Sequence, residues 1–137
     1  MTIALIDDSS EDISLLYEYI CRYCCEHKIH TSIKTFTSDT AFLSAAKDER
    51  YDLVFLDIFL QDTTGIQIAK TVKKLNPKCQ IIFSTYSKEH AVKAFRLHAL
   101  DYLLKPYTYA QLEDALNCYE HAAAKFTHYI ELKEGRF

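Results

Sequence analysis

Residues 51–60, YDLVFLDIFL, hold the pattern that decides the fold. Leu53 to Leu56 are consecutive apolar residues without alternation, which is typical of a strand covered on both faces in a parallel sheet. Asp57 follows directly, and the chain then becomes apolar again. Because an unpaired buried carboxylate is costly, a charge at this point needs a reason. A functional site at the end of a central strand is one such reason.

Outward from this strand, short apolar runs predict four more strands, of which the second is weaker and edge-like. These are residues 2–6, 29–36, 79–85 and 100–104. Runs of helical periodicity lie between and after the strands. The alternation predicts a doubly wound α/β fold, with a five-stranded parallel sheet of flavodoxin-like order 2-1-3-4-5 and helices on both faces.

Two of the predicted helices carry specific expectations. The short helix before the fifth strand should turn Ala91, Val92 and Phe95 toward the sheet. The last helix should begin with a capping box, formed by Thr108 and Gln111 three residues later.

Length and composition indicate an ordinary globular chain. The 137 residues correspond to one domain, and hydrophobic residues at 49% with charged residues at 26% are typical of a soluble protein. The net charge of −3, without a basic stripe, argues against a nucleic-acid surface. The first apolar run is too short for a signal peptide or membrane span, so we expect a cytoplasmic protein with no membrane contact.

Five cysteines, an odd number, favour free thiols in such a protein. Cys21, Cys24 and Cys25 could share one face of a helix. Small apolar core residues are the favoured interpretation, and a metal or redox cluster is the alternative.

The C-terminal residues HYIELKEGRF depart from the helical pattern. Apolar and charged residues alternate in YIELK, ahead of a turn signal at Glu134 and Gly135, which predicts a strand entering a hairpin. So short a hairpin cannot fold alone, which predicts that it belongs to a second domain after the one formed by residues 1–125. Residues 126–137 would be a linker and the first strand of a further, absent domain; a frayed tail is the alternative.

Polar residues follow four of the predicted strands, at the edge where open parallel sheets bind ligands. They are Asp7, Asp8, Asp57, Ser84, Thr85 and Lys105. Two carboxylates about 4 Å apart repel by roughly 4 kcal/mol at an effective dielectric of about 20, so three of them call for Mg²⁺ or Mn²⁺. With an ammonium opposite, this setting suits phosphoryl transfer to Asp57 as the nucleophile.

These residues resemble the receiver domain of two-component response regulators, and the resemblance covers about Met1 to Lys125. The motifs that carry it are LIDDS (5–9), DLVFLDIFLQDTTGIQIAK (52–70), IIFSTYS (81–87) and AFRLHALDYLLKPYT (94–108). The stretches ALDYLLKP and YIELKEGRF are similar to the LytTR (LytR/AlgR) subgroup, whose receiver precedes a β-rich DNA-binding domain. Only the first strand of that domain would be present.

The resemblance implies that Asp57 accepts a phosphoryl group from the phosphohistidine of a sensor histidine kinase. Asp8 and Asp57 would bind the metal directly, Asp7 mainly through water, and the backbone carbonyl of Phe59 would complete the protein ligands.

Further roles follow from the same resemblance. Lys105 would pair with a phosphoryl oxygen, and Pro106 would follow a cis peptide bond. Thr85 matches the switch hydroxyl when it is counted back from Lys105, although Ser84 beside it stays an alternative. Tyr102 matches the switch aromatic.

The resemblance also implies a signalling protein rather than an enzyme. Phosphorylation would reshape the surface of the fourth helix, fifth strand and fifth helix and favour a homodimer, and DNA would be bound only through the absent domain. Four residues depart from the usual family pattern. Tyr86 and Phe59 are bulky beside the site, and Gln61 and His98 replace a common proline and a common glycine.

Two other functions compete with this interpretation. A phosphorylation-independent interaction domain would keep the fold and use a fixed surface, but the intact set of polar residues disfavours it. A haloacid-dehalogenase-like phosphatase would need a second aspartate two residues after the nucleophile, where this chain has Phe59.

Overall fold

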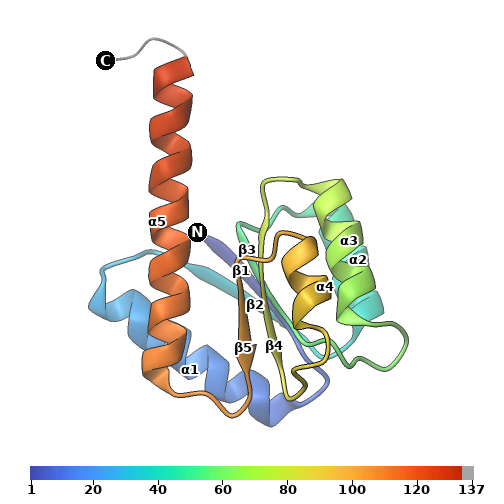
Figure 1. Ribbon diagram of the computed structural model, residues 1–137. Coiled ribbons are helices and arrows are strands. Elements are labelled where there is room, and N and C mark those ends of the chain that lie inside the picture. The colour runs from blue at the N-terminus through green and yellow to red at the C-terminus, as the bar shows by residue number, and fades with distance from the viewer. Residues whose placement is uncertain (134–137) are drawn as a thin grey trace.

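A computed structural model describes the backbone of residues 1–133 and the side chains as far as Ala123. Five parallel strands form one sheet in the order β2-β1-β3-β4-β5, so the predicted fold and strand order are confirmed (Figure 1). The strands are β1 (Thr2–Ile6), β2 (Ser32–Phe36), β3 (Leu53–Leu56), β4 (Gln80–Thr85) and β5 (Asp101–Leu104).

Helices cover both faces of the sheet, with α1 and α5 on one face and α2, α3 and α4 on the other (Figure 1). They are α1 (Ser10–Glu26), α2 (Asp39–Asp48), α3 (Gly65–Leu75), α4 (Ala91–Arg96) and α5 (Tyr109–Lys133). The capping box predicted for α5 is present. The Thr108 N–H donates to Gln111 Oε1 at 2.8 Å, and the Gln111 N–H donates to Thr108 Oγ1 at 3.3 Å.

The central strand β3 is buried along its whole length, as its unbroken apolar sequence predicts. Val54 and Leu56 pack toward α2, α3 and α4, whereas Leu53 and Phe55 pack toward α1 and α5. Each such side chain contributes about 1.5–3 kcal/mol when it is fully removed from water. Burial on both faces therefore fixes β3 in the middle of the sheet.

The pairing of β1 with β3 brings the two following aspartates together. Ile6 lies opposite Leu56, so Asp7 and Asp57 leave neighbouring strands at the same level. The Asp57 N–H donates to the Ile6 carbonyl at 3.0 Å, so the hydrogen bonding between β1 and β3 continues as far as Asp57.

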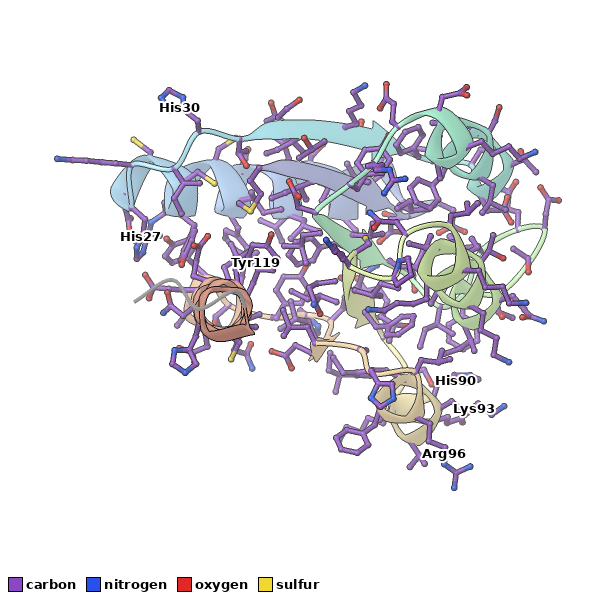
Figure 2. All side chains as sticks on the ribbon, turned by 90° about the horizontal axis from the view of Figure 1, so that it is seen from above. His27, His30, His90, Lys93, Arg96 and Tyr119 are labelled. Atoms are coloured by element: carbon purple, nitrogen blue, oxygen red, sulfur yellow. The ribbon has the colours of Figure 1, made fainter. Side chains whose placement is uncertain are left out.

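The expectation for α4 was wrong for two of its three residues. Val92 is 64% exposed and Phe95 is 81% exposed, and Ala94 is the buried residue of this helix. The inward face is made by residues three apart, Ala91, Ala94 and Leu97, so Phe95 lies about 100° round the helix from Ala94. Figure 2 shows Lys93 and Arg96 of the same helix projecting away from the sheet.

The predicted C-terminal strand was also wrong, because α5 continues without a break to Lys133 and extends past the sheet (Figure 1). Residues 109–133 contain neither glycine nor proline, and the stretch HAAAK is rich in the strongest helix former. Helix propagation adds one hydrogen bond per residue, whereas a lone strand has no partner. The predicted turn at Glu134 and Gly135 lies outside the described residues.

The cysteines divide between the core and the surface. Cys24 is buried on α1, as the favoured interpretation predicts, but Cys21 and Cys25 are exposed, so core filling was wrong for these two. Cys79 is also buried, and Cys118 on α5 is exposed.

His98 lies in the turn between α4 and β5, at the position where a glycine is common in the family. Its φ of 59° is left-handed, a conformation that glycine adopts without strain and other residues rarely adopt. The turn thus keeps the backbone that glycine would give.

Candidate phosphoacceptor site

Three carboxylates converge at the carboxyl edge of the sheet, as the sequence predicts. Asp7, Asp8 and Asp57 each offer an oxygen, and these oxygens all lie within 4.8 Å of one another. Asp7 and Asp57 are buried, with 6% of each residue exposed, whereas Asp8 is exposed. The cluster is therefore open to solvent on the Asp8 side and enclosed on the other.

Lys105, the first residue after β5, reaches across to this cluster. Its Nζ lies 2.5 Å from Asp7 Oδ2 and 3.3 Å from Asp57 Oδ2, and only 5% of its side chain is exposed. Two buried carboxylates and a buried ammonium thus form one ion-paired group. The predicted position of Lys105 opposite the aspartates is confirmed geometrically.

Sequence reasoning missed a third carboxylate at this ammonium. Asp12 Oδ2 lies 2.9 Å from Lys105 Nζ, and Asp12 is on the first turn of α1. The available signal was its position, since Asp12 lies in the first turn of the helix that directly follows the Asp7–Asp8 pair.

Burial and charge act on these groups in opposite directions. Burial raises the pKa of Asp7 to about 6, although hydrogen bonds from Lys105 and Ser9 lower it. Burial alone would lower the pKa of Lys105, but its hydrogen bonds to Asp7 and Asp12 raise that pKa above its usual value. The ammonium therefore stays charged, whereas burial disfavours the charged form of Asp7 despite its contact with Lys105.

The donor set fits a hard divalent cation. It consists of carboxylate oxygens, which Mg²⁺ and Mn²⁺ prefer, and the ligand group that includes Asp57 contains no histidine or cysteine. Two backbone N–H groups each hold one carboxylate oxygen, the Oδ1 atoms of Asp7 and Asp57, in place. Ser9 donates to Asp7 Oδ1 at 2.9 Å, and Phe59 donates to Asp57 Oδ1 at 3.3 Å.

Gly65, the first residue of α3, supports Asp57 from behind, a role that sequence reasoning did not assign. Its N–H donates to the Ile58 carbonyl at 2.8 Å. A Cβ at this position would lie 2.1 Å from the Asp57 carbonyl oxygen, so no other residue fits without moving the Asp57 backbone. The sequence signal is the single glycine of QDTTG after the strand.

The two hydroxyls at the end of β4 point to opposite faces of the sheet. Ser84 Oγ lies 3.2 Å from the Tyr107 hydroxyl, on the α5 side. Thr85 is fully buried, and its neighbour Phe83 two residues earlier packs among α2, α3 and α4. Thr85 thus lies on the same face as Phe83, the side that carries α4.

Tyr102 on β5 packs on this same face. Its ring lies 6.2 Å from the Phe83 ring, and its hydroxyl donates to the Ser87 carbonyl in the loop before α4. The Ser87 N–H in turn lies 3.5 Å from Thr85 Oγ1. One loop residue therefore contacts both Thr85 and Tyr102.

Two bulky side chains flank the cluster. The Tyr86 ring lies 5.1 Å from Lys105 Nζ and is 64% exposed, so it partly covers the ammonium. Phe59 meets the His90 ring edge to face at 5.6 Å, which joins the loop after β3 to the loop before α4. The peptide bond between Lys105 and Pro106 is cis, as the family resemblance implies.

A second group of potential metal ligands lies between α1 and α5, at Glu26, His27 and Glu113. Both oxygens of Glu26 are already engaged, one by Arg22 at 2.9 Å and the other by the Tyr109 hydroxyl at 3.2 Å. Figure 2 shows His27 at the end of α1, on the side of α5. We interpret this exposed group as contacts that join the two helices.

The family model of the response regulator receiver domain matches residues 3–117. The chain therefore belongs to the response regulator receiver family. It is similar to the "Sensory transduction protein LytR" of Staphylococcus haemolyticus, with 49% identity over 73 residues, which are 53% of this chain and 28% of that protein.

The "Transcriptional regulatory protein LytR" of Staphylococcus aureus is 39% identical over 83 residues, covering 61% of this chain and 34% of that protein. These relatives support the assignment to the LytR subgroup. The aligned part of the chain spans only 28–34% of their length, about a third.

Solved structures agree with the receiver fold. The response regulatory domain of mrkE from Klebsiella pneumoniae has a TM-score of 0.82 and 28% identity, over 91% of this chain and 99% of that one. A BeF3-activated DrrB receiver domain has a TM-score of 0.71 at 24% identity, over 88% of this chain and 97% of that one, which shows the shared fold alone. Within residues 1–133, no helix combines the length and apolar character needed to cross a membrane.

Proposed function

We propose that this receiver domain is cytoplasmic and accepts a phosphoryl group on Asp57 from the phosphohistidine of a sensor histidine kinase. In this step the phosphorus–nitrogen bond of the donor breaks, and a bond forms between phosphorus and an Asp57 carboxylate oxygen. The observation that carries the proposal is the Lys105 ammonium 3.3 Å from Asp57, beside three converging carboxylates. This arrangement suits a reaction governed by positioning and charge neutralisation.

Mg²⁺ or Mn²⁺ fits the carboxylate cluster and would supply the positive charge that neutralises the transferred group. Asp8 and Asp57 would bind the ion directly, Asp7 through water, and the Phe59 carbonyl would complete the protein ligands. The chain's own residues then divide the remaining work. Lys105 pairs with a phosphoryl oxygen, and the Phe59 N–H orients Asp57.

Phosphorylation would act as a switch because it adds about −1.5 to −2 charges and three strong acceptor oxygens. Thr85 is the switch hydroxyl in this proposal, since it lies on the face of the sheet that carries Tyr102 and α4, whereas Ser84 lies on the other face. A displaced Thr85 would alter the Ser87 contacts that hold Tyr102 and the loop before α4.

The output of the switch would be a homodimer formed through α4, β5 and α5. The exposed Val92 and Phe95 support this choice of surface, because their apolar area is free to be buried by a partner. Residues 1–125 form the receiver in this proposal, and residues 126–137 lead to a LytTR-type DNA-binding domain through which transcription is controlled.

Intact-protein mass spectrometry after incubation with acetyl phosphate and Mg²⁺ tests the proposal. We expect a mass gain of one phosphoryl group in the wild-type domain and none in Asp57→Asn or in EDTA. Sedimentation of the same samples should show dimers only with the phosphoryl group or its fluoroberyllate mimic. An unmodified wild-type protein would favour the phosphorylation-independent interaction domain instead.

A further inference from the structure

We infer that Asp12 is a positioning residue that anchors the Lys105 ammonium in both the resting and the phosphorylated state. This inference rests on the proposed phosphorylation of Asp57 and extends it to a residue outside the predicted site. Its basis is the 2.9 Å contact between Asp12 Oδ2 and Lys105 Nζ.

The first turn of α1 explains why Asp12 is available for this contact. Ser9 is the N-cap, and its side chain accepts from the Asp12 N–H at 3.3 Å, so Asp12 occupies the third helical position. In a capping box, the acidic side chain at this position would reach back to the N-cap N–H. Here the Ser9 N–H donates to Asp7 Oδ1 instead. The Asp12 carboxylate is thereby released to reach Lys105.

The ammonium has three hydrogens, and three carboxylates surround it. Asp7 and Asp57 belong to the group of oxygens that can hold a cation, whereas Asp12 does not. A bound cation would draw on Asp57 directly and on Asp7 through water, and a phosphoryl group would take up an oxygen of Asp57. Asp12 is therefore the one partner of Lys105 that neither of these events claims.

The surroundings of Asp12 leave the Lys105 ammonium an alternative position that the contact with Asp12 prevents. The Asp12 side chain is 25% exposed and the Lys105 side chain 5%, so the pair lies at the boundary between the core and solvent. A small cavity of about 50 Å³ opens there, lined by Asp12, Leu15, Tyr86, Lys105, Pro106 and Tyr107. Without Asp12 the ammonium could turn into this cavity, away from Asp57.

Three variants and the rate of phosphorylation by acetyl phosphate test the inference. Asp12→Ala removes the anchor, and we expect a rate about tenfold below wild type, the ratio that corresponds to one lost charge-assisted hydrogen bond. Asp12→Asn keeps an acceptor oxygen and should stay within about twofold of wild type. Glu11→Ala removes the neighbouring exposed charge from the same helical turn, and should also stay within about twofold.

A fourth measurement separates positioning from a structural effect. In a Lys105→Ala background, Asp12→Ala should slow phosphorylation no further, because the residue through which it acts is gone. Equal rates for Asp12→Ala and Glu11→Ala, or an undiminished effect without Lys105, would overturn the inference while leaving phosphorylation of Asp57 intact. If the wild-type domain itself gains no phosphoryl group, the proposed function fails and this role of Asp12 fails with it.

Discussion

Two regions of this domain, the carboxyl edge of the sheet and the outer face of α4, distribute polarity in opposite ways. At the sheet edge, Asp7, Asp57 and Lys105 are buried. On α4, Val92 and Phe95 are exposed although both are large and apolar. Neither arrangement favours folding. Buried charges lose their hydration, and apolar side chains that stay exposed contribute no hydrophobic stabilisation to the folded state. The two regions are therefore where we expect function to have shaped the sequence.

The strongest contrast should appear when one phenylalanine from each environment is replaced. Phe83 on β4 is fully buried, so Phe83→Ala should lower the free energy of unfolding by about 4 kcal/mol. Phe95→Ala should change it by less than about 0.5 kcal/mol, because Phe95 is 81% exposed. Urea denaturation of both variants provides the measurement. A large loss for Phe95→Ala would mean that α4 packs more tightly than described here.

Replacement of the buried cation should have the next largest effect. Lys105→Met keeps an unbranched apolar stem, one atom shorter than that of lysine, but leaves Asp7 and Asp57 without their counter-charge, at a cost of about 3 kcal/mol in EDTA. Mg²⁺ bound at the proposed site would stabilise the folded state and should therefore restore part of this stability. Denaturation without Mg²⁺ measures the stability lost with the ammonium, and denaturation with Mg²⁺ measures how much of it the ion restores. Lys34→Met, which removes an exposed ion pair with Glu49, is the matched control and should cost little.

The pH dependence of stability should report on Asp7. Its folded-state pKa of about 6 lies above the unfolded value of 3.8, so this carboxyl favours the folded state most at low pH. That contribution is fully present below about pH 3.8 and is lost as the pH rises through about 6, with a span of about 2 kcal/mol after allowance for partial exposure. Thermal unfolding of wild type and Asp7→Asn in EDTA isolates it. Identical pH profiles for the two proteins would contradict the expectation.

The smallest effect should come from Asp57, the proposed phosphoacceptor. Asp57→Asn removes two repulsions, with Asp7 and Asp8, and one attraction, with Lys105. In EDTA we therefore expect a gain of about 1 kcal/mol in the free energy of unfolding. With saturating Mg²⁺ the gain should vanish, since the wild type then has a counter-ion. A variant that is less stable than wild type in EDTA would show that Lys105 already balances the cluster.

The sheet and most of the site could be predicted from the sequence because both depend on local patterns. An unbroken apolar run such as Leu53 to Leu56 predicts a central strand, and parallel strands bring their carboxyl ends together. The exposure of Phe95 could not be predicted, because periodicity gives the angle between residues but not which side of a six-residue helix meets the sheet. Asp12 was missed because its contact depends on where the Ser9 N–H donates.

The prediction of a C-terminal strand was wrong for a related reason. The alternation in YIELK has a period of two, but a strand is stable only where another strand pairs with it. Helix α5 includes that segment, and no glycine or proline before Lys133 ends the helix. Which face of the sheet Ser84 and Thr85 each lie on likewise needed the structure, because alternation places them on opposite faces without saying which face carries α4.

The uninterrupted course of α5 has a mechanical consequence. In a continuous helix each residue is rotated by a fixed angle of about 100° from the one before it. A rotation of α5 about its axis at Tyr109, beside β5, would therefore turn Lys133 by the same angle. Insertion of a single alanine among residues 124–132 would turn everything beyond it by about 100° and advance it by about 1.5 Å. Insertion of seven residues, nearly two complete turns, would bring the following residues back to within about 20° of their original direction. The direction in which Lys133 faces, as well as its distance from the sheet, is therefore set by the number of residues in α5.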